Sequence, residues 1–165
     1  MARIGPELPD GPLVSFGLCG ALVDGLSPGT IVTARSVVDE AGEALWEEAP
    51  RTVAGARAVV LCAAGRIVDA AGERTSLAER SGAEVVDLES GRLAATGRLA
   101  GVVRVVSDTP SVPLGPLAGA VTSAGETDVR AAVRAFLLAP RASLRAARAG
   151  RRALAALERA AADLA

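Results

Sequence analysis

The hydrophobic residues of the chain gather in five short, valine-rich runs, and these runs predict β-strands. The runs are Leu13–Phe16, Ile31–Ala34, Ala58–Cys62, Glu84–Asp87 and Val102–Val106. In the third run, Val59, Val60 and Leu61 follow one another without polar residues between them, as in a strand that is covered on both faces. We therefore expect all five strands to lie in one sheet.

The segments between these runs predict turns and helices. Gly17 and Gly20 predict a turn directly after the first strand, and residues 42–55 predict a loop or a short helical turn. Further along the chain, Thr75 or Ser76 is a candidate cap for a short helix that Gly82 ends.

Three more helices follow from apolar residues at helical spacing, over residues 89–100, 126–139 and 141–165, with Pro140 breaking the last two apart. The first of them places Leu93, Ala94 and Gly97 on one face. Strands that alternate with helices indicate an α/β protein. We expect a three-layer α/β/α arrangement around a mixed, mostly parallel sheet.

The chain divides into an irregular N-terminal arm (1–12), a single α/β domain (13–139) and a C-terminal amphipathic helix (140–165). Residues 130–159 carry eight arginines and one acid, Glu158. An apolar stripe runs along the last helix, formed by Ala147, Gly150, Leu154, Leu157, Ala161 and Leu164. This pattern favours a helix packed on the domain with its arginines in solvent, and a partner helix or an anionic membrane surface is the alternative.

The amino-acid composition excludes several kinds of catalytic and metal site. The chain contains no His and no Lys, which excludes His-based triads, His-ligated metals and Schiff bases on lysine. Its net charge of −1 gives no case for nucleic acid. The N-terminus lacks the apolar core of a signal peptide and no apolar run reaches about 18 residues, so we expect a cytoplasmic protein. Cys19 and Cys62 lie in apolar runs and are expected to be buried thiols, with a disulfide as the alternative.

Acidic residues stand where the predicted strands end. Asp87 and Glu89 follow the fourth strand, and Asp108 follows the fifth. In open α/β sheets, ligands bind beyond the carboxyl ends of the strands, so a ligand-facing role is one interpretation. The other is helix capping and solvated strand ends.

Several segments resemble the nucleoside phosphorylase and nucleosidase superfamily. "VVDLESGRLA" resembles its V-[DE]-M-E-[SA] segment, "RVVSDTP" its R-x-[IV]-S-D segment, and "SFGLCGALVDGLSPGTIVTA" its glycine-bearing block, in the family's order. "GRIVDAAGERTSLAERSGAEVVDLES" is similar to the branch associated with hopanoid biosynthesis, whose members cleave adenine from adenosylhopane.

The resemblance implies cleavage of an N-glycosidic bond, without a cofactor and with phosphate as a candidate co-substrate. In this comparison Asp108 protonates the leaving base and Glu89 accepts hydrogen bonds from the ribose hydroxyls. An acid at the end of a buried strand suits the first role. Further residues would contact the sugar or the base, or would orient Asp108. They are Leu88, Ile67, Val68, Ser107, Gly17 and Gly20.

The chain also departs from the family. Only about a dozen residues precede the glycine-bearing block, where the family has further strands and a glycine loop. Thr30 replaces an aspartate and Gly65 replaces the acid expected before "RIV". The alternative function is therefore a non-catalytic ligand-binding or assembly protein. Because members of the family are dimers or larger, we expect a homo-oligomer, foremost a two-fold dimer, with aliphatic residues at its interface. The C-terminal stripe with Leu154 and Leu157 is one candidate for that interface.

Overall fold

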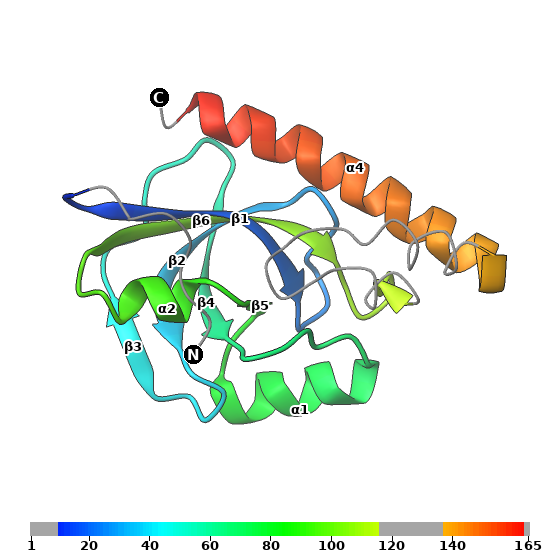
Figure 1. Cartoon of the computed structure of the whole chain (residues 1–165), viewed down its shortest axis with the longest axis horizontal. Helices are drawn as coiled ribbons and strands as arrows, with labels where there is room; N and C mark the ends of the chain where they lie inside the picture. The colour runs from blue at the N-terminus through cyan, green and yellow to red at the C-terminus, as the bar shows by residue number, and fades with distance from the viewer. Residues whose placement is uncertain (1–9, 116–136, 164–165) are drawn as a thin grey trace.

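The strands of the chain join one sheet in the order β3-β2-β4-β5-β1-β6 (Figure 1). The computed structural model describes residues 10–115 and 137–163. Its strands are β1 (Leu13–Ala21), β2 (Ile31–Val38), β3 (Ala44–Glu47), β4 (Arg57–Ala63), β5 (Val85–Asp87) and β6 (Leu99–Asp108). Its helices are α1 (Ala71–Ser81), α2 (Ser90–Ala94) and α4 (Pro140–Ala162). All five predicted strands are present in this sheet.

The sheet is mixed, and five of its strands close into a ring. The β1–β6, β2–β4 and β4–β5 pairs are parallel, and the β1–β5, β2–β3 and β2–β6 pairs are antiparallel. Closure occurs because β2 divides one edge between two partners. Its residues 31–33 pair with β6, and its residues 36–38 pair with β3. The ring therefore has an inside and an outside.

Aliphatic side chains fill the inside of the ring. One buried cluster takes residues from all five ring strands, among them Cys19, Val32, Leu61, Val85 and Val102. Trp46 of β3 packs against this cluster and donates its indole N–H to the Leu99 carbonyl (2.8 Å). With only two Phe, one Trp and no Tyr in the chain, valine and alanine supply this packing.

Helices α1 and α4 cover the outside of the ring. In Figure 1, α1 lies below the sheet and α4 lies along its upper side. Leu77 of α1 packs with Val86 of β5 in a second buried cluster, and Ala153 and Ala156 of α4 pack on Val105 of β6. Small alanine side chains let α4 lie close to the strand.

Some local predictions were wrong. The expected turn at Gly17 and Gly20 is absent because β1 continues to Ala21. Part of the segment 42–55, expected to be a loop, forms β3 because it pairs with the free edge of β2. Helix α1 begins at Ala71 without a side-chain cap, ahead of Thr75, although Gly82 ends it at φ 69° as predicted.

The second predicted helix is shorter than expected, since α2 ends at Ala94 and Gly97 adopts a positive φ of 68°. Pro140 occupies the first turn of α4, where a missing N–H is tolerated, and so begins this helix. Most of the predicted helix 126–139 lies outside the described residues.

The face that α4 buries also differs from the predicted stripe. Its buried residues are Ser143, Ala146, Ala149, Ala153, Ala156 and Ala160, whereas Leu154 is 52% exposed. Leu157 is partly buried and packs beside Ala153 and Ala156. Small side chains occupy these inner positions, and two of them, Ala153 and Ala156, pack directly on Val105 of β6. Within the described residues, no helix combines the length and the hydropathy that a membrane crossing needs.

Candidate functional site

A cavity of about 670 Å³ opens beside β1, at the ends of β5 and β6. All eight site residues predicted from the sequence line it, and they are Gly17, Gly20, Ile67, Val68, Leu88, Glu89, Ser107 and Asp108. They come from four separate parts of the chain. The fold therefore brings together residues that lie up to about ninety positions apart in the sequence.

The cavity exists because β1 and β5 diverge. One edge of β1 pairs with β6 along the whole strand, whereas β5 pairs only with Gly20 and Ala21. Beyond that pair, Asp87, Leu88 and Glu89 turn away from β1 and line the cavity together with residues 14–19. The split between two neighbouring strands thus exposes both β1 and the end of β5 to a ligand.

Apolar side chains form much of the cavity wall. Ile67 and Val68 come from the loop after β4, and Leu88 follows β5. Phe16, which the sequence placed only in a strand, also lines the cavity and is 38% exposed. Such a wall suits the flat faces of a heterocyclic base or another apolar group.

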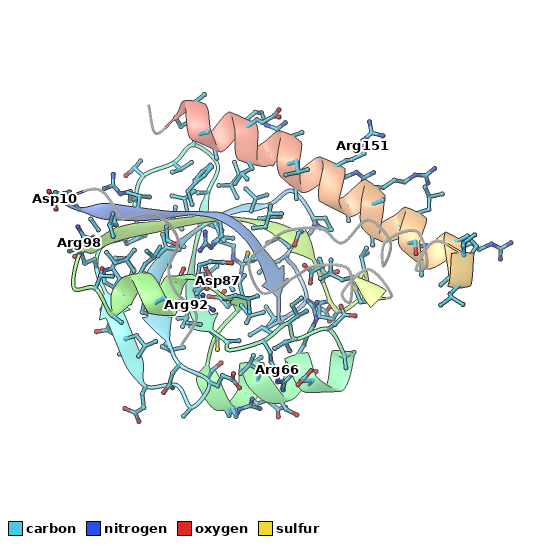
Figure 2. All side chains as sticks on the ribbon, viewed as in Figure 1. Asp10, Arg66, Asp87, Arg92, Arg98 and Arg151 are labelled. Carbon is cyan, nitrogen blue, oxygen red and sulfur yellow. The ribbon has the colours of Figure 1, made fainter. Side chains whose placement is uncertain are left out.

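Arg104 holds the first carboxylate inside the ring. Strand alternation turns it inward with Val102 and Val106. Its Nε donates to Asp87 Oδ2 (2.6 Å), and its Nη2 pairs with the same carboxylate and donates to Ser15 Oγ (2.6 Å). Figure 2 shows Asp87 in the middle of the molecule. Because these polar groups satisfy one another, the charge can stay buried.

Ser90 completes this cluster and connects it to α2. Its hydroxyl donates to Asp87 Oδ2 (2.5 Å), and its N–H donates to Asp87 Oδ1 (3.2 Å). Asp87 is therefore fully occupied by partners inside the protein. Glu89 is the next acid along the chain and is 56% exposed at its side chain, with Oε2 3.6 Å from Arg104 Nη2. Of these two acids, Glu89 has the more accessible carboxylate.

Arg74 holds the second carboxylate. It lies in α1, is fully buried, pairs with Asp108 Oδ2 and donates to the Ala21 carbonyl (2.7 Å). Asp69 contacts the same guanidinium (3.4 Å). The Asp69 carboxylate also accepts the N–H groups of Leu114 and Gly115, both at 2.9 Å. Asp108 is thereby fixed to α1 and to the loop after β6.

Ser107 gives Asp108 two hydrogen-bond arrangements. The Ser107 hydroxyl lies 2.6 Å from Asp108 Oδ1 and 3.1 Å from the Cys19 carbonyl, but it has one hydrogen. Ser107 therefore donates either to Asp108 or to the Cys19 carbonyl, and in the first arrangement it fixes the orientation of the Asp108 carboxyl group.

Gly17 and Gly20 make room for the two arginines. A Cβ on Gly17 would lie 2.9 Å from Arg104 Nη1, and a Cβ on Gly20 would lie 2.9 Å from Asp108 Oδ2 and 3.3 Å from Arg74 Nη1. Neither glycine has a positive φ. They are required for space inside a strand, which differs from the turn that the sequence suggested.

The sequence did not identify the two arginines. Arg104 gave a signal, because a charge in the middle of "VVRVV" has no place in a buried strand without a partner. Arg74 gave none, since it looks like any polar residue of a surface helix. Its burial depends on Asp108, 34 residues further along.

The two cysteines are buried and are not joined by a disulfide, as expected for thiols in apolar runs. Burial raises the pKa of the Cys19 thiol far above its usual range, and burial, followed by the charge of Glu40, raises the pKa of Cys62 to about 11. Neither thiol is suited to act as a nucleophile at neutral pH. Over residues 10–115 and 137–163, Cys, Asp and Glu side chains form no group of three that could hold a metal ion.

Comparisons with known proteins find similarity at the level of structure. A Helicobacter pylori 5′-methylthioadenosine/S-adenosylhomocysteine nucleosidase matches with a TM-score of 0.50 and 14% identity, over 87% of this chain and 67% of that one. Another structure of the H. pylori nucleosidase (TM-score 0.48, 16% identity) matches over 59% of this chain and 57% of that one. The H. pylori futalosine hydrolase (TM-score 0.48, 16% identity) matches over 59% and 56%.

This chain spans 57% of the length of the second of these structures and 56% of the length of the third. No protein-family model matches the sequence, and no curated protein matches it. At 14% identity, the similarity to the nucleosidase shows the fold. The chain has an α/β fold like that of a nucleosidase.

Proposed function

We propose that this chain cleaves the N-glycosidic bond of a nucleoside in the cavity beside β1. One observation carries the proposal. Glu89, just after β5, and Asp108, the last residue of β6, line the same largely apolar cavity, and each lies next to a buried arginine. The motifs that resemble the nucleosidase superfamily contribute these two acids.

Each acid has a role in this reaction. Breaking the bond leaves positive charge on the sugar and negative charge on the base, so a proton delivered to the base lowers the barrier. Asp108 delivers that proton, and Ser107 positions it. Glu89, the more exposed carboxylate, accepts hydrogen bonds from the sugar hydroxyls.

The apolar wall binds the base. Ile67 and Val68 pack against the face of the base, and Phe16 lines the same cavity. Leu88 contacts the sugar. The proposal extends to adenine as the base, to a lipid-linked nucleoside as the substrate, and to water or phosphate as the acceptor of the sugar. It also includes a cytoplasmic homo-oligomer and the three-layer arrangement of the superfamily.

A second function has its own support. Both oxygens of Asp108 already have protein partners, Arg74 and Ser107. Gly65 and Thr30 stand where the superfamily pattern has acids. These features favour a protein that binds a nucleoside, or assembles with another chain, without cleaving it.

Release of free base separates the two functions. The chain is incubated with adenosine, 5′-methylthioadenosine, inosine and uridine, with and without phosphate, and the free base is measured by chromatography. We expect release of base from at least one of them. Asp108→Asn lowers the rate by roughly 10²- to 10⁴-fold, as expected for loss of a general acid.

Glu89→Gln lowers kcat/KM by about 10- to 100-fold, since hydrogen bonds to a charged acceptor are lost. Glu79→Gln, an exposed change on α1, is the matched control and keeps full activity. Saturable nucleoside binding in calorimetry without any base release would support the non-catalytic function. Base release that survives Asp108→Asn would refute the role of Asp108.

A further inference from the structure

Helix α4 carries a concentrated positive charge on the outside of the molecule. It contains six arginines and one acid, Glu158, and the arginines are Arg141, Arg145, Arg148, Arg151, Arg152 and Arg159. The helix therefore has a net charge of +5 in a chain whose total is −1, so the rest of the chain carries −6. Such separation of charge favours an anionic partner at this helix.

These arginines are exposed and available. All six are solvent-exposed, and none forms an ion pair with another residue in the described ranges. Several exposed arginines elsewhere do form ion pairs, as in Arg57 with Glu84 and Arg66 with Glu73, although Arg51 and Arg92 form none with a described residue. In Figure 2, Arg151 points away from the body of the molecule. The six guanidinium groups are free to bind a partner.

The inner face of α4 holds the helix in place. Ala153, Ala156 and Ala160 are fully buried against the sheet, so the helix cannot turn without losing this packing. The arginine-bearing side therefore faces outward as a fixed surface. We call it the arginine face of α4, defined by the six arginines and by Leu144, which lies among them and is 45% exposed.

Exposed leucines distinguish between anionic partners. Leu137 and Leu138, just before α4, are 79% and 72% exposed, and Leu154 is 52% exposed. A bilayer takes up both kinds of side chain, since arginines bind lipid phosphates and leucines enter the acyl boundary. A nucleic acid would not bury these leucines on binding, and α4 contains no aromatic residue to stack on bases.

We infer that the arginine face of α4 binds the surface of an anionic phospholipid bilayer, with Leu144 and the leucines at the start of the helix entering its interface. This inference does not depend on the chemistry in the cavity, which lies mainly between the strands. The attraction is electrostatic over about one Debye length and weakens as salt is added.

Vesicle sedimentation with the full chain tests the inference. The probes are vesicles of phosphatidylcholine alone and vesicles that also contain phosphatidylserine. We expect the chain to sediment with the second kind only, and less so at high salt. Replacing Arg141, Arg148 and Arg151 by Gln weakens this partitioning by roughly 100-fold. Leu144→Gln weakens it to a smaller extent.

The matched control changes the same amount of charge elsewhere. Arg35, Arg57 and Arg80 are also exposed, lie outside α4 and pair with acids, and their replacement by Gln leaves partitioning unchanged. Circular dichroism verifies that both triple variants are folded. The inference is overturned if the chain ignores anionic vesicles, if the control variant loses binding equally, or if duplex DNA binds as tightly with the same dependence on the α4 arginines. A chain that stays off vesicles while the α4 variant dissociates a dimer would identify the face as an interface between copies.

Discussion

Replacing Arg74 by methionine leaves the Asp108 carboxylate buried without its cation. The side chains of this pair are 0% and 8% exposed, so water does not compensate either charge. Removing one partner of such a pair costs about 3–5 kcal/mol in the free energy of unfolding. For a chain of this size, the melting temperature falls by roughly 10 °C.

The reason for this loss is testable with a second substitution. Adding Asp108→Asn to Arg74→Met removes the unpaired charge, so the double variant should recover most of the lost stability. Urea unfolding followed by circular dichroism measures all three variants against the unchanged chain. The control is Arg80→Met, whose exposed pair with Glu40 (3.5 Å) should contribute less than about 1 kcal/mol.

A loss below about 1 kcal/mol for Arg74→Met would place the pair among exposed ion pairs. That result would refute the assignment of Arg74 as the residue that holds Asp108. A double variant no more stable than Arg74→Met would show that the loss comes from packing of the arginine stem rather than from the charge.

Three further predictions concern space, thiols and assembly. Gly17→Ala and Gly20→Ala each lower the free energy of unfolding by about 1–3 kcal/mol, because the new methyl groups press on Arg104 and on Asp108. The control is Gly72→Ala on α1, where a methyl group has open space, and thermal melts should show it to be neutral or stabilising. The pKa of Cys62 is about 11 in the folded chain against an ordinary value of 9.0, so the stability contributed by the neutral buried thiol is complete below pH 9 and is lost as pH rises toward 11. Cys62→Ala should therefore flatten the decline of stability at alkaline pH. An unchanged decline would contradict this role of Cys62. Sedimentation velocity at micromolar concentration should show a homo-oligomer, and a stable monomer would rule it out; Leu154→Glu alone is the variant to test at α4, because Leu157 packs inward.

The sequence was sufficient for five of the six strands in the described residues and for the meeting of Glu89 and Asp108 at one cavity. Valine runs are strong strand signals because β-branched side chains pack well on a pleated, half-buried sheet. Glu89 and Asp108 were identified because two of these runs end next to them. The closure of five strands into a ring could not be predicted from the sequence. The β2–β6 pairing joins Ile31 to Val105, and nothing local to either residue specifies the other. Strand β3 was missed for the same reason, since its partner is the free edge of β2.

The missed parts of the site share one physical cause. A buried arginine and an exposed one have the same sequence signature unless the surrounding residues are apolar, as they are for Arg104 but not for Arg74. The leucine stripe predicted on α4 failed because helical spacing marks a face but does not set the distance to the sheet. Here alanines occupy the inner positions, and Leu154 is exposed.

A crystal structure of the chain with a bound nucleoside analogue tests the central claim most directly. The account predicts that the analogue occupies the cavity beside β1, with its sugar hydroxyls within hydrogen-bond distance of Glu89, its base against Ile67 and Val68, and the edge of the base next to Asp108. An analogue bound outside this cavity, or one whose sugar contacts neither acid, would contradict it.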